Sequence, residues 1–373
     1  MFFVFIKEVF ALDKAIYRPI LRFKRGEQTA LSYLSGTAKS AIKPLVNITP
    51  HSFDPISPEG LDDVFDQRLA QDAGRLNSIW AGYEAAVDLG DIDSNAQCVQ
   101  AAHPVRYFFN CIYGDEVRAN INPVLRFNSD DDYIAAVASV CRDFNIAPVL
   151  RLTPDDLAEP ETETVISKML GECGVSSQET EMVVDMGYIT TKGRSQIMAK
   201  GALSAVPFVE DWATLSLVAG SFPESLSDFI VGRHTIERRE WPVWLSNRNV
   251  AGREVIYGDY ATIHPIPVED GLDPKTMNPS ASVRYTHEHT WLLLRGYGVR
   301  SRDGAGFTQF VSHANTLVGS PEYRGKDFSF GDAKIMRISQ GEDKQGNLET
   351  WVTIGVNHHI SEVVYQLANL GES

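Results

Sequence analysis

The chain has 373 residues, a mass of 41.4 kDa, 43% hydrophobic residues and a formal net charge of -15 at pH 7. This length and composition fit one large globular domain, or one large domain with a small one. The acidic balance opposes unspecific binding to nucleic acid or to an anionic membrane, but it leaves room for a local basic pocket.

Neither the cysteines nor the apolar segments point to an exported or membrane protein. Cys98, Cys111, Cys141 and Cys173 form no CxxC pair or zinc-type spacing, so reduced and mostly buried thiols are expected. No apolar stretch approaches the roughly 18 residues of a membrane span. The apolar residues 1–7 lack the basic flank and the length of a signal peptide, and are expected to form an extra strand or a plug under a barrel. A cytoplasmic protein is predicted.

A five-residue phrase occurs three times: Pro-Ile-Leu-Arg-Phe at 19–23, Pro-Val-Leu-Arg-Phe at 123–127 and Pro-Val-Leu-Arg-Leu at 148–152. Proline cannot donate to a strand ladder, which favours the first position of a strand. Short apolar runs between polar segments are typical of strands buried on both faces of a parallel sheet. Each copy then brings an arginine to the carboxyl end of a strand, where such folds bind ligands.

Strands and helices alternate as far as residue 250. The predicted strands are 16–23, 42–48, 84–90, 120–127, 146–152, 181–186, 213–220 and 241–246. The predicted helices are 59–79, 130–143, 161–172, 191–204 and 224–234, while 91–119 contains no clean helix. This alternation favours an α/β fold, a TIM-like (β/α)8 barrel, over a doubly wound sheet.

Beyond residue 250 the pattern becomes antiparallel and turn-rich. We predict a barrel domain at 1–250, a linker at 251–279 and a β-rich C-terminal subdomain at 280–373 that ends in a helix. Its expected strands are 281–298, 333–339 and 351–355, and its expected helix is 359–370. The subdomain either packs beside the barrel mouth or has its own small core.

Four segments carry a family resemblance: Tyr17-Arg-Pro-Ile-Leu-Arg-Phe-Lys-Arg-Gly-Glu-Gln-Thr-Ala-Leu, Ile42-Lys-Pro-Leu-Val-Asn-Ile, Phe328-Ser-Phe-Gly-Asp and Trp351-Val-Thr-Ile-Gly-Val-Asn-His-His. Together they resemble the phage "beta protein" family over nearly the whole chain. Members of that family occur in phages and bacterial genomes, often near mobile or defence genes. The resemblance implies a phage-conflict or antiviral-defence setting with protein partners from such a system. It supplies no catalytic residues.

The arginines of the repeated phrase are candidate ligand-binding residues. If Arg22, Arg126 and Arg151 point inward, their guanidiniums converge with Lys24 at the barrel mouth. Such a cluster suits a phosphate or a carboxylate. In the alternative interpretation each arginine pairs with a carboxylate, because buried arginines are usually paired. The candidate partners are Glu27, Asp88, Asp155 and Asp185.

Candidate catalytic groups are Asp88, Asp185 and Glu27. The two aspartates each follow an apolar strand and stand two residues before a glycine. Acids on different strands could act as general acid and base or share a divalent cation. Alternatively, the aspartates form turns. No HxH, HExxH or DxDxG motif supports a metal in the barrel half, so no cofactor is predicted and a divalent cation stays an open alternative.

Histidines are secondary candidates. His287 and His289 fall in a predicted strand, where alternation places both imidazoles on one face. His358 and His359 are expected to open the last helix. Paired imidazoles suit a metal site or a catalytic base. The alternative for His358 and His359 is helix capping and hydrogen bonding between the two parts of the chain.

Two functions therefore stay open. In the first, the protein is a sensor or adaptor that binds an anionic ligand or a protein partner at the barrel mouth. In the second, it is a hydrolase acting on a phosphate-containing or acidic substrate. The first is favoured because no complete catalytic constellation can be assembled, and GxSxG, Walker A and GxGxxG motifs are absent from the sequence.

Overall fold

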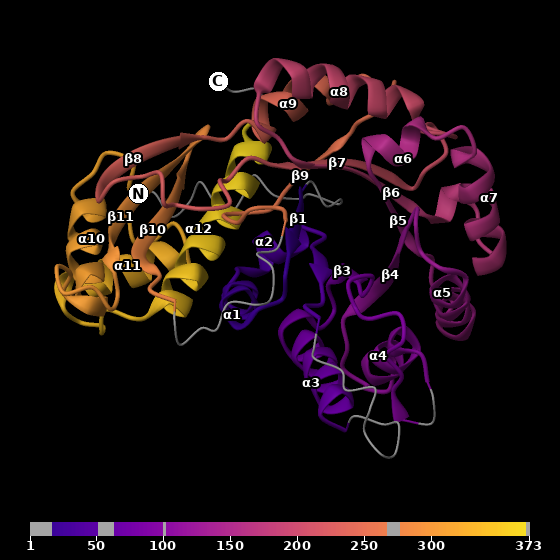
Figure 1. The fold of residues 1–373 in the computed structure, drawn as a ribbon, viewed down its shortest axis with the longest axis horizontal. Coiled ribbons are helices and arrows are strands. Elements are labelled where there is room, and N and C mark those ends of the chain that lie inside the picture. Colours follow the sequence, from indigo (N-terminus) through magenta and orange to yellow (C-terminus); the bar gives the residue numbers. More distant parts are fainter. Residues whose placement is uncertain (1–16, 51–62, 100–101, 267–276, 371–373) are drawn as a thin grey trace.

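A computed structural model describes residues 17–50, 63–99, 102–266 and 277–370. Residues 1–7, for which a strand or plug was expected, lie outside this described part. Eight parallel strands close into a barrel in the order β1-β2-β3-β4-β5-β6-β7-β9, with helices around the outside (Figure 1). The predicted (β/α)8 barrel is confirmed.

The barrel strands are short and buried. They are β1 (Tyr17–Leu21), β2 (Leu45–Asn47), β3 (Glu84–Asp88), β4 (Asn120–Arg126), β5 (Val149–Leu152), β6 (Glu181–Tyr188), β7 (Thr214–Gly220) and β9 (Ile256–Asp259). Pro148 stands one residue before β5, and Pro19 and Pro123 lie inside strands, so none of the three prolines takes the predicted first position.

The eighth strand was misplaced. Residues 241–246 lie in helix α9 (Glu240–Asn247), so the strand prediction there is wrong. The inner face of this short helix is apolar, and periodicity alone does not separate a short apolar helix from a strand. The barrel is instead closed by β9, which pairs with both β7 and β1 and lies within the segment 251–279 that was expected to be a linker.

The outer helices follow the strands. They are α1 (Arg25–Ser32), α2 (Gly36–Ser40), α3 (Asp63–Trp80), α4 (Pro104–Tyr113), α5 (Asp131–Phe144), α6 (Pro154–Ala158), α7 (Thr162–Cys173), α8 (Lys192–Ala205) and α9. Helix α4 occupies the segment where no helix was expected. Its signal is the buried series Val105, Phe108, Phe109 and Ile112 behind Pro104.

The barrel interior is filled in layers. At the amino ends of the strands, Arg18 and Lys43 form ion pairs with Glu181. The middle layer is apolar and comprises Ile20, Leu45, Ala86, Val124, Val149, Val183 and Val218. The barrel is therefore a packed core rather than a pore, and ligands have access only at its ends.

The C-terminal extension combines a small sheet with three helices. Strand β8 (Gly232–Glu237) pairs with β11 (Thr290–Gly298), which pairs with β10 (Ser280–His287). The helices are α10 (Gln309–Val318), α11 (Phe330–Gln340) and α12 (Leu348–Ala368). The helix expected at 224–234 and the strands expected at 333–339 and 351–355 are therefore wrong. In α11 the buried positions Ile335 and Ile338 stand three residues apart, which is a helical spacing.

Helix α12 completes the ring of barrel helices. In Figure 1 it runs beside β1 and β9, on the outside of the barrel. The Thr353 hydroxyl donates to the carbonyl of Gly26, and the Asn357 amide donates to the carbonyl of Ala30, both in α1. The extension also has its own apolar core between the sheet and its helices. The small core that was one of the two alternatives is therefore present, and α12 joins the extension to the barrel through α1.

Two smaller expectations concern the thiols and the membrane. The four cysteines are free, and three of them are buried. Within the ranges that the structure describes, no helix has the length and apolarity needed to cross a membrane.

Candidate functional site

The carboxyl ends of the barrel strands carry a polar layer. Arg126 and Arg151 stand opposite each other in register on β4 and β5. Arg151 reaches across the mouth: its Nη1 donates to Asp88 at 2.8 Å, and its Nη2 donates to Asp185 at 2.7 Å. Its Nη2 also donates to the hydroxyl of Tyr260 at 3.0 Å. These contacts involve side chains from β3, β6 and the end of β9, so Arg151 links three sides of the barrel.

Arg126 is paired in the same way. Its Nε donates to Asp88 at 2.9 Å, and its Nη1 donates to Asp91 at 2.6 Å. Burial alone would raise the pKa of Asp88, but Arg126 and Arg151 outweigh it and hold that pKa below the usual value. Burial would lower the pKa of Arg126, and Asp88 and Asp91 raise it instead. Asp88 and Arg126 are therefore both charged at neutral pH.

The two aspartates of this layer also shape their turns. Oδ1 of Asp88 accepts the backbone N–H of Gly90 at 2.9 Å, and Oδ1 of Asp185 accepts that of Gly187 at 2.9 Å. Gly187 has a φ of +57°, which favours glycine. At Gly90, a Cβ atom would lie 3.0 Å from Arg126 Nε. Each carboxylate thus has both oxygens engaged, one in a turn and one with arginine.

Arg22 differs from the other two arginines. It is half-buried just after β1, and its Nη2 donates to the backbone carbonyls of His264 and Pro265. Among the residues that the structure describes, no carboxylate forms an ion pair with it. Burial lowers the pKa of Arg22, although Glu27 opposes that effect. The next residue, Phe23, has a φ of +51°, a conformation that is uncommon outside glycine.

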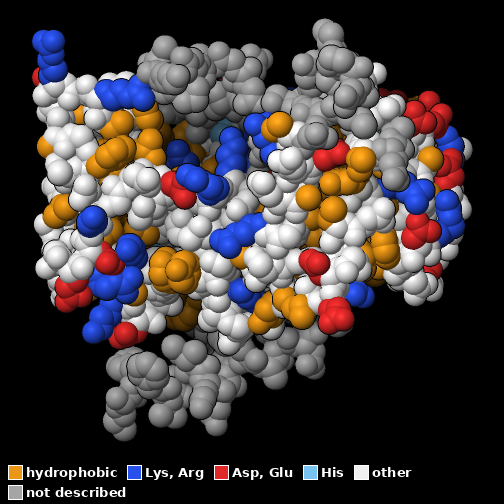
Figure 2. Space-filling view, turned by 90° about the horizontal axis from the view of Figure 1, so that it is seen from below, with side chains coloured by type: hydrophobic (Ala, Val, Ile, Leu, Met, Phe, Trp, Pro, Cys, Tyr) orange, Lys and Arg blue, Asp and Glu red, His pale blue; other side chains and the backbone are white. Residues whose placement is uncertain are grey.

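Arg22 faces a cavity of about 540 Å³, called here the mouth cavity. It lies where β1, β2 and β9 end, between α1, α3 and the start of α12. Its lining residues are Arg22, Phe23, Lys24, Arg25, Gly26, Glu27, Gln28, Thr49, Asp72, Ile263, Glu349 and Val352. Figure 2, which views the molecule from below, shows Lys and Arg side chains near the middle of that face. Lys24 is exposed beside the first turn of α1, where backbone N–H groups favour anions.

Glu27 is the acid with the most altered pKa in the mouth cavity. It is buried, and one of its oxygens accepts the backbone N–H of Lys24 at 3.1 Å. Burial raises the pKa of Glu27 to about 7. A carboxyl group with such a pKa can hold or release a proton near neutral pH, which is the property required of a general acid or base.

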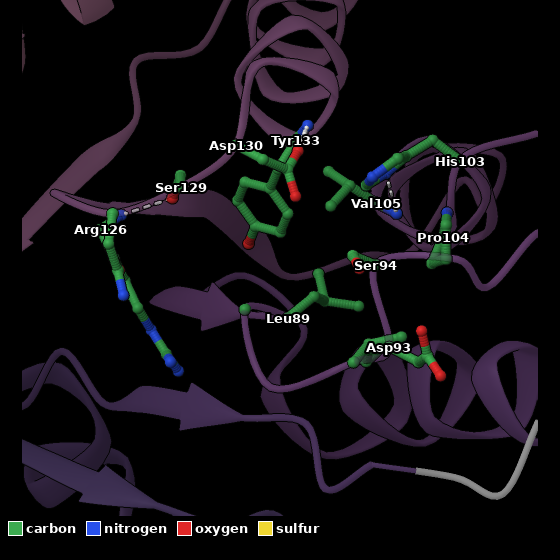
Figure 3. A pocket seen from close by; sticks show the side chains of 13 residues that line it. Leu89, Asp93, Ser94, His103, Pro104, Val105, Arg126, Ser129, Asp130 and Tyr133 are labelled. Carbon is green, nitrogen blue, oxygen red and sulfur yellow. Dashed lines mark hydrogen bonds between the residues drawn. The ribbon is translucent and has the colours of Figure 1, made fainter.

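A second cavity, of about 140 Å³, lies above β3 and β4 (Figure 3). Arg126 stands on one side of it, and His103 and Pro104 stand on the other. Its polar side chains cap helices: Nδ1 of His103 accepts the N–H of Val105, and Asp130 accepts that of Tyr133. This smaller cavity therefore contains groups that already have structural partners.

The four predicted histidines do not line the mouth cavity. His287 ends β10 and His289 lies in the turn before β11, where Glu288 has a φ of +47°, so the two imidazoles do not share one strand face. The expected position of His358 and His359 at the start of a helix is also wrong, because both are buried in the middle of α12. They cap no helix, but the expected bond between the two parts of the chain is present: His359 Nε2 lies 2.9 Å from Asp259.

Sequence reasoning missed two residues near the mouth. Asp259 accepts the N–H of Ala261 at 2.9 Å, as Asp88 and Asp185 do in their turns, but the pattern noted there required a glycine two residues later and Ala261 does not match it. Arg284 on β10 donates to the carbonyl of Thr262 at 2.6 Å. No sequence signal points to Arg284, because its position beside the mouth depends on how the extension packs.

Two further predictions concern Asp155 as a partner of the arginines and a possible metal site. Asp155 lies exposed in the first turn of α6, and the described ion pairs of the three arginines do not involve it. Within the described ranges, no group of three or more His, Cys, Asp or Glu side chains is arranged to hold a metal ion. The roles assigned to the site residues stay predictions.

Comparisons with known proteins give one clear match. A sequence model for a family described as "Beta protein" matches residues 17–365. No curated protein sequence matches the chain.

Solved structures resemble the chain only weakly. A protein described as a fructose-1,6-biphosphate aldolase from Coccidioides immitis has 10% identity and a TM-score of 0.38, and the alignment covers 96% of this chain and 91% of that one. The YdjI aldolase from Escherichia coli K12 has 7% identity and a TM-score of 0.36, with 96% and 93% covered. Similarities at this level carry no argument about chemistry.

Proposed function

The chain belongs to the beta protein family, and from that premise we propose that it is a sensor or adaptor that binds an anionic ligand in the mouth cavity. The proposed setting is a phage-conflict system whose protein components are its partners. The proposed setting is supported by the resemblance to phage beta proteins. The proposed anionic ligand is supported by the charged side chains at the barrel mouth.

The observation that carries the proposal is the contrast between Arg22 and the other two arginines. Arg126 and Arg151 are neutralised by Asp88, Asp91 and Asp185. Arg22 faces a 540 Å³ cavity with carbonyl partners only, within the described residues. A half-buried cation without an ion pair is costly, even with Glu27 nearby, and an anionic ligand would compensate it. Lys24 and the first turn of α1 add attraction from the same side.

Binding also fits the state of the aspartates better than catalysis does. Asp88 and Asp185 each use one oxygen in a turn and the other with Arg151. A carboxylate held in this way supports the mouth, but it is poorly placed to transfer a proton. This favours the sensor or adaptor over the hydrolase.

Calorimetric titration with pyrophosphate and with citrate tests the proposal. We expect the wild type to bind at least one of these anions, and we expect Arg22→Gln to weaken binding by about tenfold or more, the size of one lost charged hydrogen bond. Arg142→Gln is the matched control, because Arg142 is exposed at the far end of α5. Equal binding by Arg22→Gln and wild type would contradict the proposal.

Glu27 is the one observation that supports the hydrolase as a second candidate. It lines the mouth cavity and has a pKa of about 7. If the cavity is catalytic, the protein releases phosphate from p-nitrophenyl phosphate and Glu27→Gln abolishes that release. If the protein only binds, no turnover above buffer occurs in either protein, and the hydrolase is excluded for this class of substrate.

A further inference from the structure

Arg284 is a second arginine near the mouth without a carboxylate partner among the described residues. It lies on β10 in the extension and is partly buried. Its Nη1 donates to the carbonyl of Thr262 at 2.6 Å, and its guanidinium lies 4.4 Å from the ring centre of Phe222. Burial lowers the pKa of Arg284 to about 10, and the charge of Arg22 acts in the same direction.

Arg22 and Arg284 meet at one short loop. Arg22 donates to the carbonyls of residues 264 and 265, and Arg284 donates to the carbonyl of residue 262. One guanidinium comes from the barrel and the other from the extension. Two like charges gathered at one partly buried loop repel each other, and neither guanidinium forms an ion pair with a carboxylate among the described residues.

Each of the two guanidiniums also has N–H donors that form no hydrogen bond with the described residues. A guanidinium has five N–H donors. Within the described part of the chain, Arg22 uses only Nη2 and Arg284 uses only Nη1 in hydrogen bonds. The unused donors match the oxygens of a phosphate, which accepts paired N–H bonds from guanidinium.

We propose that Arg22 and Arg284 together bind one phosphate group of the ligand, at the junction between barrel and extension. This inference rests on the proposed function and names the ligand class: a phosphate monoester or a pyrophosphate. A phosphate carries a charge of about -1.5 to -2 at neutral pH, enough to compensate both arginines, whereas a single carboxylate compensates only one. Because the two arginines belong to different parts of the chain, an occupied site would tie the extension to the barrel.

The test is a calorimetric titration of the full chain with pyrophosphate, with citrate as the carboxylate comparison. Arg22→Gln and Arg284→Gln are each expected to weaken pyrophosphate binding by about tenfold or more. The double variant is expected to lose less than the product of the two factors, because both side chains hold one group. Arg302→Gln, exposed in the extension, is the charge-matched control and is expected to bind like the wild type.

The outcomes separate this inference from the proposed function. If folded Arg284→Gln binds pyrophosphate like the wild type while Arg22→Gln does not, the proposal of a shared phosphate site is wrong. The proposal that an anion binds in the mouth cavity through Arg22 is then still supported. The shared phosphate site is equally wrong if citrate binds through Arg22 and pyrophosphate does not bind. If neither anion depends on Arg22, both proposals fail.

A folding control accompanies the titration. If Arg284→Gln does not give the circular dichroism spectrum of the wild type, Arg284→Lys replaces it. This variant keeps the charge but loses the forked donors, and a smaller loss of pyrophosphate affinity is expected. Wild-type affinity in Arg284→Lys would contradict the inference.

Discussion

At the scale of single residues, the adjacent histidines His358 and His359 differ in protonation: the first ring is charged and the second is neutral. His358 Nδ1 lies 2.8 Å from the Asp332 carboxylate and Nε2 lies 2.7 Å from the carbonyl of Thr286. Both partners only accept hydrogen bonds, so both nitrogens of His358 carry protons. His359 lies between Asp259 and the hydroxyl of Thr286, which can donate, so a neutral ring suffices there.

The pKa shifts follow the same division. Burial opposes the charge on His358, but Asp332 outweighs it and raises the pKa of His358 above 6.5. For His359 burial dominates and lowers the pKa below 6.5. The stability from His358 is thus complete below about pH 6.5 and is lost as pH rises through its folded pKa. The stability from His359 is complete above about pH 6.5 and is lost as pH falls.

This contrast gives a prediction for the two histidines. At pH 6, His358→Gln is expected to lower the free energy of unfolding by about 3 kcal/mol, because it leaves Asp332 buried without its partner. That deficit should shrink as the pH rises towards 9. The deficit of His359→Gln should instead shrink as the pH falls from 7.5 to 5. Guanidinium chloride unfolding at several pH values measures both trends, and equal trends in the two variants would contradict the assignment.

At the scale of secondary structure elements, the close packing of α1 against α12 decides how the extension joins the barrel. Gly26 lies in the first turn of α1, where a Cβ atom would stand 2.9 Å from Val352 Cγ1 and 3.2 Å from the Glu349 carbonyl. Any side chain at this position pushes the two helices apart. The hydrogen bonds of Thr353 and Asn357 to α1 depend on the same approach.

Alanine at two helical glycines tests this packing. Gly26→Ala is expected to lower the free energy of unfolding by about 1–3 kcal/mol, the usual cost of overpacking. Gly74 in α3 is the control: a Cβ there meets nothing within 4 Å, so Gly74→Ala is expected to be neutral or to stabilise by up to about 1 kcal/mol. Chemical denaturation compares the midpoints. A midpoint for Gly26→Ala at or above that of Gly74→Ala would show that α1 and α12 do not pack this closely.

At the scale of the whole molecule, the barrel and the extension share one core. Val356, Ile360, Val363 and Val364 of α12 belong to the same apolar cluster as the outer faces of the barrel strands. The buried bond between His359 and Asp259 crosses the same boundary, and strand β8, inserted after β7, completes the sheet of the extension. The extension therefore contributes to the stability of the barrel and is not an independently folded module.

Truncation tests whether the barrel depends on the extension for its stability. A chain ending at residue 279 lacks α12 and is expected to lose cooperative unfolding and to bind the dye ANS, because the apolar surface under α12 becomes exposed. The full chain is expected to unfold in one transition observed by both fluorescence and circular dichroism. A truncated chain that unfolds cooperatively near the wild-type midpoint would show that the barrel is stable without α12.

Much of the fold could be predicted from local sequence. Seven of the eight barrel strands and the helices α3, α5, α7 and α8 follow from short apolar runs and helical spacing, whereas the single strand predicted at 281–298 is divided into β10 and β11 by a turn. Three of the errors fall on α9, α11 and α12, whose apolar runs were taken as strands, because a short run does not reveal its period. The joining of β8 to β11 is a contact between distant segments, which local patterns do not encode.

The sequence by itself determined that three arginines reach the ends of barrel strands and that Asp88 and Asp185 precede tight turns, because both depend on neighbours along the chain. Only the tertiary structure decided which arginine is left without a carboxylate. Arg126 and Arg151 lie on β4 and β5, between β3 and β6, which carry the two aspartates. Strand β1 lies between β2, which ends at Asn47, and β9, whose terminal Asp259 already contacts Tyr17 and His359. Barrel closure sets those neighbours, so the lack of an ion pair at Arg22, among the described residues, is a property of the closed fold.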